Sequence, residues 1–188
     1  MESVRPELLE EKLREESIPG ESFSLYGVLD GASIPDLRMQ IYKLEPDSEC
    51  LFEGELEPDM QEVAPYLVSL QQGHPFTDWV LSKAWGQHWG IFVQSQANMQ
   101  QMLQHCRKFI VVYDETGKPL RFRYYDPRVL PTFLPTCNKD ELSKFFGPVQ
   151  RILMEGESPE TMLTFECKTG ELKRQEVSLA GASPAPAR

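Results

Sequence analysis

The stretch "FRYYDPRVL", residues 122–130, carries two arginines around an aromatic pair and an Asp-Pro step, and a further arginine directly precedes it. If the stretch begins as a β-strand, alternate side chains point to opposite faces. One face then carries three polar side chains able to contact a partner: Arg121, Arg123 and Tyr125. The other face carries two aromatic side chains: Phe122 and Tyr124.

The second half of the stretch predicts a corner. Pro127 ends the strand, because it lacks a backbone N–H, and it suits the first turn of a following helix. Asp126 is placed to accept hydrogen bonds from the N–H groups just after it. Both Arg123 and Arg128 can reach the Asp126 carboxylate. Two interpretations follow: a corner locked by its own ion pairs, or an arginine-bearing surface that binds a partner.

Outward from this corner, strand-like and helix-like segments alternate. Runs of β-branched and aromatic residues predict strands at 23–32, 49–55, 60–70, 89–95, 109–126 (a hairpin), and a final strand or two between 150 and 179. Apolar periodicity and capping residues predict helices at 33–44, 75–85, 97–109 and 138–146, with a proline-broken helical piece at 127–137. The order predicts an α/β fold, a mixed sheet with flanking helices.

The first 20 residues are charged throughout and carry only a thin apolar stripe: Leu8, Leu9 and Leu13. We interpret residues 1–20 as a solvated arm that folding does not need. A helix that packs on a partner is the alternative.

The remaining chain divides by composition. Residues 21–178 are predicted to form the folded domain, either as one unit or as two small lobes at about 21–73 and 74–178. Residues 179–188 are small and proline-rich, so they are predicted to form a disordered tail.

The net charge of −10 argues against a nucleic-acid partner, because neutralising phosphates needs a basic face. It equally argues against docking on an anionic membrane. No apolar run approaches the roughly 20 residues that a membrane helix needs, and the charged N-terminus does not resemble a secretory signal. These features predict a soluble cytoplasmic protein.

The sequence contains no recognisable catalytic or cofactor motif. Its four cysteines are far apart and are expected to be free thiols, without metal-ligand spacing: Cys50, Cys106, Cys137 and Cys167. Nucleotide-binding glycine motifs, a nucleophile elbow and an H-E-x-x-H pair are absent. We therefore predict no cofactor, no metal and no enzyme activity. A small cytosolic enzyme with a non-local Cys/His or carboxylate site remains an alternative.

An acidic run follows the segment "CLF": Glu53, Glu55, Glu57 and Asp59. Paired carboxylates perform acid–base chemistry only when their surroundings separate their pKa values. We interpret this run as a solvated face.

The segments "FRYYDPRVL" and "ELSKFFGPV" together resemble the signature of the type VI secretion effector adaptors, also called effector chaperones (the Tap/TEC, VasW-like family). Four earlier segments follow the family's order: "LYGVLDGA", "CLFEGE", "VAPYLVSL" and "WGIFVQS". The resemblance covers roughly residues 23–153. It marks seven residues as structural motif positions: Asp30, Gly31, Asp126, Pro127, Phe146, Gly147 and Pro148.

The resemblance implies a non-enzymatic adaptor that binds a cognate protein toxin and helps to load it onto the VgrG spike or a PAAR tip. It makes four residues candidates for partner binding: Arg121, Arg123, Tyr125 and Arg128. The net acidity suits a partner with a basic or apolar binding segment. An immunity protein that neutralises a toxin is the further alternative.

Overall fold

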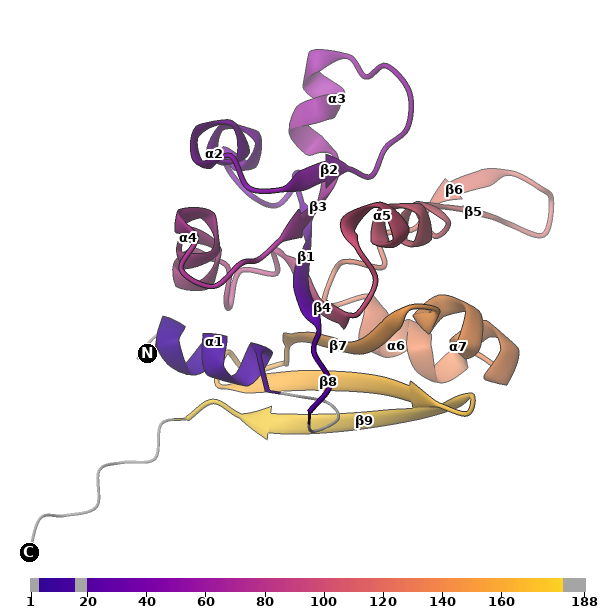
Figure 1. Cartoon of the computed structure of the whole chain (residues 1–188). Helices are drawn as coiled ribbons and strands as arrows, with labels where there is room; N and C mark the ends of the chain where they lie inside the picture. The colour runs from indigo at the N-terminus through magenta and orange to yellow at the C-terminus, as the bar shows by residue number, and fades with distance from the viewer. Residues whose placement is uncertain (1–3, 16–19, 181–188) are drawn as a thin grey trace, which may run out of the picture.

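The computed structural model describes residues 4–15 and 20–180. In these residues a seven-stranded sheet runs through the molecule in the order β2-β3-β1-β4-β7-β8-β9 (Figure 1). Every strand pairing is antiparallel. Its strands are β1 (Ser24–Asp30), β2 (Ser48–Cys50), β3 (Pro65–Ser69), β4 (Gly90–Ser95), β7 (Val149–Glu155), β8 (Thr161–Lys168) and β9 (Glu171–Ser178).

Helices cover both faces of this sheet (Figure 1). One face packs against α1 (Pro6–Leu13), α2 (Leu37–Leu44) and α4 (Pro75–Lys83). The other packs against α5 (Met99–Arg107), α6 (Leu130–Phe133), the 3₁₀ turn Leu134–Thr136 and α7 (Lys139–Phe146). The short α3 (Pro58–Val63) lies beyond the β2 edge.

The two-sided cover explains the nearly continuous apolar runs of the central strands. Successive side chains of a strand point to opposite faces. In β4, Ile91 and Val93 enter the core under α5 to α7, while Phe92 enters the core under α1, α2 and α4. The predicted α/β fold with flanking helices is confirmed, and the sheet that the sequence predicts to be mixed is antiparallel in all its pairings. The sheet takes strands from both of the predicted lobes, 21–73 and 74–178.

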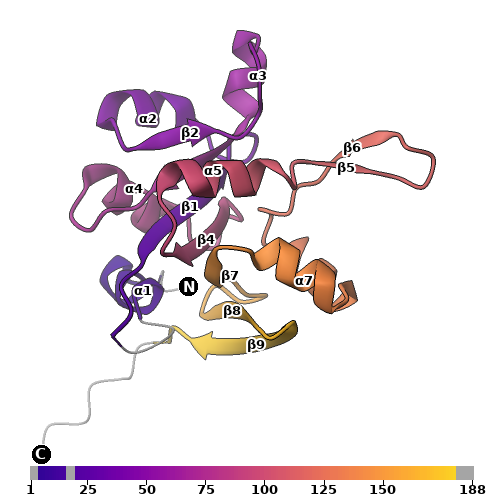
Figure 2. The same ribbon diagram turned by 45° about the vertical axis from the view of Figure 1, so that its right-hand side comes forward.

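A second, two-stranded sheet projects from the body of the molecule (Figures 1 and 2). It is the predicted hairpin, formed by β5 (Val111–Tyr113) and β6 (Pro119–Arg121). Its turn is built around Asp114, whose carboxylate accepts hydrogen bonds from the backbone N–H groups of Thr116 and Lys118 at 2.8 and 2.9 Å. The strands of this hairpin contain only three residues each, so β6 ends earlier than the sequence predicts.

The interpretation of the N-terminal segment as a solvated arm is wrong. Leu9 and Leu13, four residues apart in α1, are fully buried in the core that also contains α4 residues. The helix is fastened further by the Arg14 guanidinium, which donates to the Leu70 carbonyl at 2.9 Å. A thin apolar stripe is therefore enough to bury one side of α1, because α1 covers a part of the sheet face that none of the other described helices covers (Figure 1).

The far end of the chain also differs from expectation. Leu179, placed in the predicted tail, is buried, and its N–H donates to the Glu160 carbonyl at 2.7 Å. The rest of that tail, residues 181–188, lies outside the described residues, as do residues 1–3 and 16–19. No helix in the described part of the chain is both long and apolar enough to cross a membrane.

Candidate partner-binding site

The corner predicted at Asp126 is present. Asp126 is buried, and its carboxylate receives the Arg128 guanidinium in a two-pronged contact, with Nε at 2.9 Å and Nη2 at 2.7 Å. The backbone N–H of Arg128 donates to the same carboxylate at 2.9 Å. Burial alone would raise the pKa of Asp126, but the hydrogen bonds from Arg128 outweigh burial and hold that pKa below its usual value.

Arg123 also belongs to this corner, although its side chain is 44% exposed. Its guanidinium donates to the carboxylate of Asp30 at the end of β1, 93 residues away in the sequence, and lies 3.9 Å from the Asp126 carboxylate. The Asp30 side chain is only 2% exposed and also accepts the Ser33 hydroxyl at 2.7 Å. The ion pair connects the segment after the hairpin to β1, an inner strand of the sheet.

The predicted common face of Arg121, Arg123 and Tyr125 is wrong. The strand ends at Arg121, so alternation does not continue past it, and both Tyr124 and Tyr125 are buried. Burial raises the pKa of the Tyr125 hydroxyl to about 12. Tyr125 is therefore part of the core and cannot meet a partner.

The remaining motif positions shape the backbone. A Cβ on Gly31 would lie 2.3 Å from the Ala64 carbonyl oxygen, so only glycine fits beside this strand. Gly147 ends α7 at φ +48°, and Phe146 before it is buried. Pro127 follows Asp126 in the corner turn, and the Pro148 carbonyl accepts the Ser95 hydroxyl at 2.7 Å. These contacts agree with a structural role.

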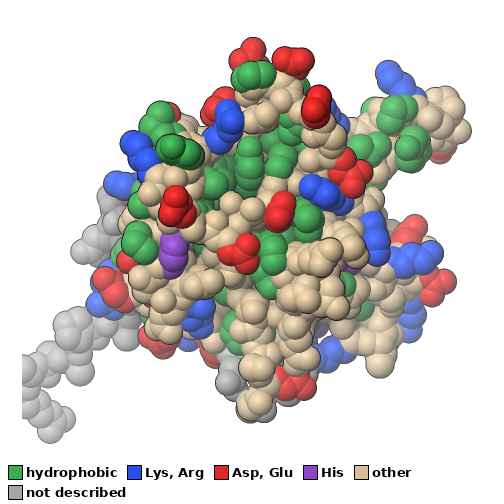
Figure 3. Space-filling view, turned by 45° about the horizontal axis from the view of Figure 1, so that its top comes forward, with side chains coloured by type: hydrophobic (Ala, Val, Ile, Leu, Met, Phe, Trp, Pro, Cys, Tyr) green, Lys and Arg blue, Asp and Glu red, His purple; other side chains and the backbone are tan. Residues whose placement is uncertain are grey.

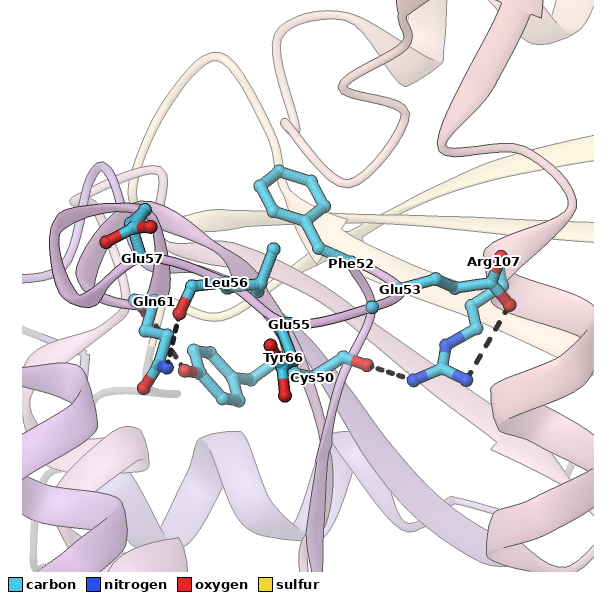
Figure 4. Close-up of a pocket in the computed structure, with 10 residues that line it drawn as sticks. Cys50, Phe52, Glu53, Glu55, Leu56, Glu57, Gln61, Tyr66 and Arg107 are labelled. Carbon is cyan, nitrogen blue, oxygen red and sulfur yellow. Dashed lines mark hydrogen bonds and ion pairs between the residues drawn. The ribbon is translucent and has the colours of Figure 1, made fainter.

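An open groove lies at the same end of the sheet as this corner. Its loop follows β2, and the backbone N–H of Leu51 donates to the carbonyl of Pro65, which pairs with Asp30 in the sheet. The groove has a volume of about 810 Å³ and is formed by the loop between β2 and α3, together with single residues from β2, α3, β3 and α5 (Figure 4). A neighbouring hollow of about 250 Å³ shares four lining residues with this groove and reaches the base of the β5–β6 hairpin. Together these hollows are called the groove below. The shared residues are Phe52, Glu53, Leu56 and Arg107.

Hydrogen bonds hold both ends of the groove loop in place. At one end, the Arg107 guanidinium donates to the Cys50 carbonyl at 2.7 Å and lies 3.8 Å from the Glu53 carboxylate (Figure 4). At the other end, the Gln61 amide donates to the Leu56 carbonyl at 2.8 Å. The loop thus presents its side chains from a supported backbone.

Arg121 is the one predicted partner-binding residue that the fold brings to the groove. Its guanidinium lies over the Phe52 ring, 4.3 Å from the ring centroid, and both residues line the hollow at the hairpin base. Such stacking orients the arginine without neutralising its charge. Arg128 stays at the corner, where its guanidinium is partly exposed.

Three residues of the acidic run lie at the rim of the groove. Glu53, Glu55 and Glu57 are exposed lining residues. Only Glu53 has a basic partner; Glu55, Glu57 and Asp59 form no ion pair with another described residue. The sequence identified this run as a solvated face, but gave no signal that it borders a groove, because the opposite wall comes from residues about 50 to 70 positions later.

Exposed apolar side chains gather at this end of the molecule. Of the seven large hydrophobic side chains that are exposed in the described residues, four lie on the β5–β6 hairpin: Val111, Val112, Tyr113 and Leu120. The other three lie on α2 and α3: Met39, Tyr42 and Val63. Figure 3 views this end and shows hydrophobic side chains spread across it among acidic ones. An apolar surface of this kind is typical of an interaction site.

The groove is lined by acidic and apolar side chains, arginines and one thiol. Burial raises the pKa of the Cys50 thiol, which keeps that sulfur protonated and weakly nucleophilic at neutral pH. None of the described residues that line the groove is a histidine. The described residues contain no cluster of three or more His, Cys, Asp or Glu side chains suited to a metal ion.

Comparison with known proteins finds a match to a protein family. The model of the family described as "Domain of unknown function (DUF4123)" matches residues 25–144, which include both the corner and the groove. No curated protein and no solved structure matches the chain. Since the match covers well over half of the 188 residues, the chain belongs to the DUF4123 family.

Proposed function

We propose that this protein is a non-catalytic adaptor that binds a protein toxin of the type VI secretion system in the cytoplasm and helps to load it onto the VgrG spike or a PAAR tip. The DUF4123 family is associated with adaptors of type VI secretion effectors. The ordered segments quoted from the sequence support the same assignment, and all of them fall within the family match except residues 145–149 at the end of "ELSKFFGPV".

The observation that carries the proposal is the exposed apolar hairpin beside an acidic groove. Four large apolar side chains are exposed on this one short projection, and exposed apolar surface is a feature of protein interaction sites. The carboxylates nearby are exposed, and the one thiol of the groove has a raised pKa. This chemistry favours protein binding over catalysis.

Co-purification tests the proposal. The tagged full-length chain is co-expressed with the toxin encoded beside its gene, and the eluate is analysed by size exclusion with light scattering. We expect a stable complex that persists at micromolar protein and retains the toxin's own enzymatic activity. If neither the toxin nor the spike is retained, the adaptor assignment is wrong. A complex in which toxin activity is abolished identifies an immunity protein instead.

A further inference from the structure

We infer that the groove and the adjoining face of the β5–β6 hairpin form the toxin-binding surface, and that they bind a segment of the toxin in which Lys or Arg alternates with apolar side chains. The inference rests on the proposed function and assigns to it a place and a partner chemistry. It moves the binding site away from Arg123, Tyr125 and Arg128 and retains only Arg121.

The hairpin register shows how the groove continues outward. Val111 pairs with Arg121, and both line the hollow at the hairpin base. Residues directly opposite each other share a face, and alternate pairs share the same face again. The pair Tyr113 and Pro119 therefore lies on the groove side, two residues farther out. With 71% of its surface exposed, Tyr113 provides an aromatic contact at the outer end.

The opposite wall supplies both apolar contact and negative charge. Phe52 and Leu56 are half-buried and line the groove, so part of each side chain is open to a partner. Between and beyond them, Glu55 and Glu57 project their carboxylates without an ion-pair partner among the described residues. A segment that fits this wall needs apolar side chains to contact Phe52 and Leu56, and cationic side chains to pair with Glu55 and Glu57.

Charge selects among the possible occupants. A second copy of this chain carries the same net charge of −10, so its acidic surface would be repelled from the rim. Nucleic acid would be repelled in the same way. A basic and apolar segment of a protein partner is the occupant that complements both the carboxylates and the exposed side chains of the hairpin.

Charge reversal at the rim tests the inference on the full-length protein. The double variant Glu55→Lys/Glu57→Lys changes exposed side chains, so we expect an unchanged melting temperature. Its affinity for the neighbouring toxin, measured by calorimetry, should fall by about tenfold or more at low salt, and the loss should shrink as salt is raised. Tyr113→Ala should weaken binding by about tenfold at all salt concentrations.

The matched control is Glu157→Lys/Glu176→Lys. It makes the same change in net charge at exposed positions on the β7–β8 turn and on β9. We expect it to bind toxin nearly as the unmodified protein does. Equal affinity in the groove variants and the unmodified protein, or equal weakening in the control, would overturn the assigned surface while toxin binding stands. Absence of binding by the unmodified protein would overturn the adaptor function itself.

Discussion

The double variant Leu9→Ala/Leu13→Ala should lose most of the stability of the folded chain. Each leucine is fully buried between α1 and the sheet face that it shares with α4. Truncating a buried leucine to alanine removes apolar contact and leaves a cavity, at a cost of about 2–5 kcal/mol. Two such losses total about 4–10 kcal/mol, which is comparable to the whole stability of a typical domain.

Urea unfolding followed by circular dichroism measures this effect. Leu8→Ala is the control, because Leu8 lies in the same helix but is only half-buried, and we expect it to cost about 1 kcal/mol. A double variant that stays within about 1 kcal/mol of the unmodified protein would mean that α1 is dispensable. The interpretation of residues 1–20 as an arm that folding does not need would then be correct.

Removal of Arg123 should produce the second large effect. Arg123→Ala leaves the Asp30 carboxylate buried without its cation, although the Ser33 hydroxyl and the Ala32 N–H still donate to it. Loss of one partner of a buried ion pair costs about 3–5 kcal/mol. Because the Arg123 side chain is 44% exposed, solvent weakens the pair, and we expect a loss of about 2–4 kcal/mol.

A double-mutant cycle isolates the Arg123–Asp30 contact. Asp30→Asn removes the charge but keeps an acceptor, so Asp30→Asn/Arg123→Ala should be less damaging than the sum of the single variants. Arg128→Ala is the comparison at the same corner. Its side chain is more exposed, so its removal should cost only about 1 kcal/mol. If Arg123→Ala costs no more than Arg128→Ala, Arg123 is a surface residue and is available to a partner.

Local chemistry made much of the fold predictable. Asn138 and Glu141 have the spacing of a capping box, and the structure contains both reciprocal hydrogen bonds at the start of α7. The turn at Thr169-Gly170 takes the positive φ values expected of a tight hairpin. The helix 97–109 was predicted from its apolar face, and Met102 and Cys106 are indeed buried. In each case the signal lies within about one turn of the chain.

Long-range partners were not predictable in the same way. The sequence indicated that Asp126 and Arg128 could pair, because they are two residues apart, but gave no reason to pair Arg123 with Asp30. Strand alternation alone therefore predicts that Arg123 shares an open face with Arg121. The alternation does not apply to Arg123, because β6 ends at Arg121. The groove was missed for a similar reason, since its walls come from residues 50–66 and 107–121.

Hydrogen exchange of the full-length chain, with and without its toxin, tests the central claim most directly. Binding in the groove should slow amide exchange in residues 51–57 and in the hairpin segment 109–122, because a partner there excludes water and restrains local opening. Exchange in β9, on the far edge of the sheet, should stay unchanged. Protection confined to β9 or to α1 would contradict the assigned surface, and an unchanged exchange pattern throughout the chain would contradict the adaptor function.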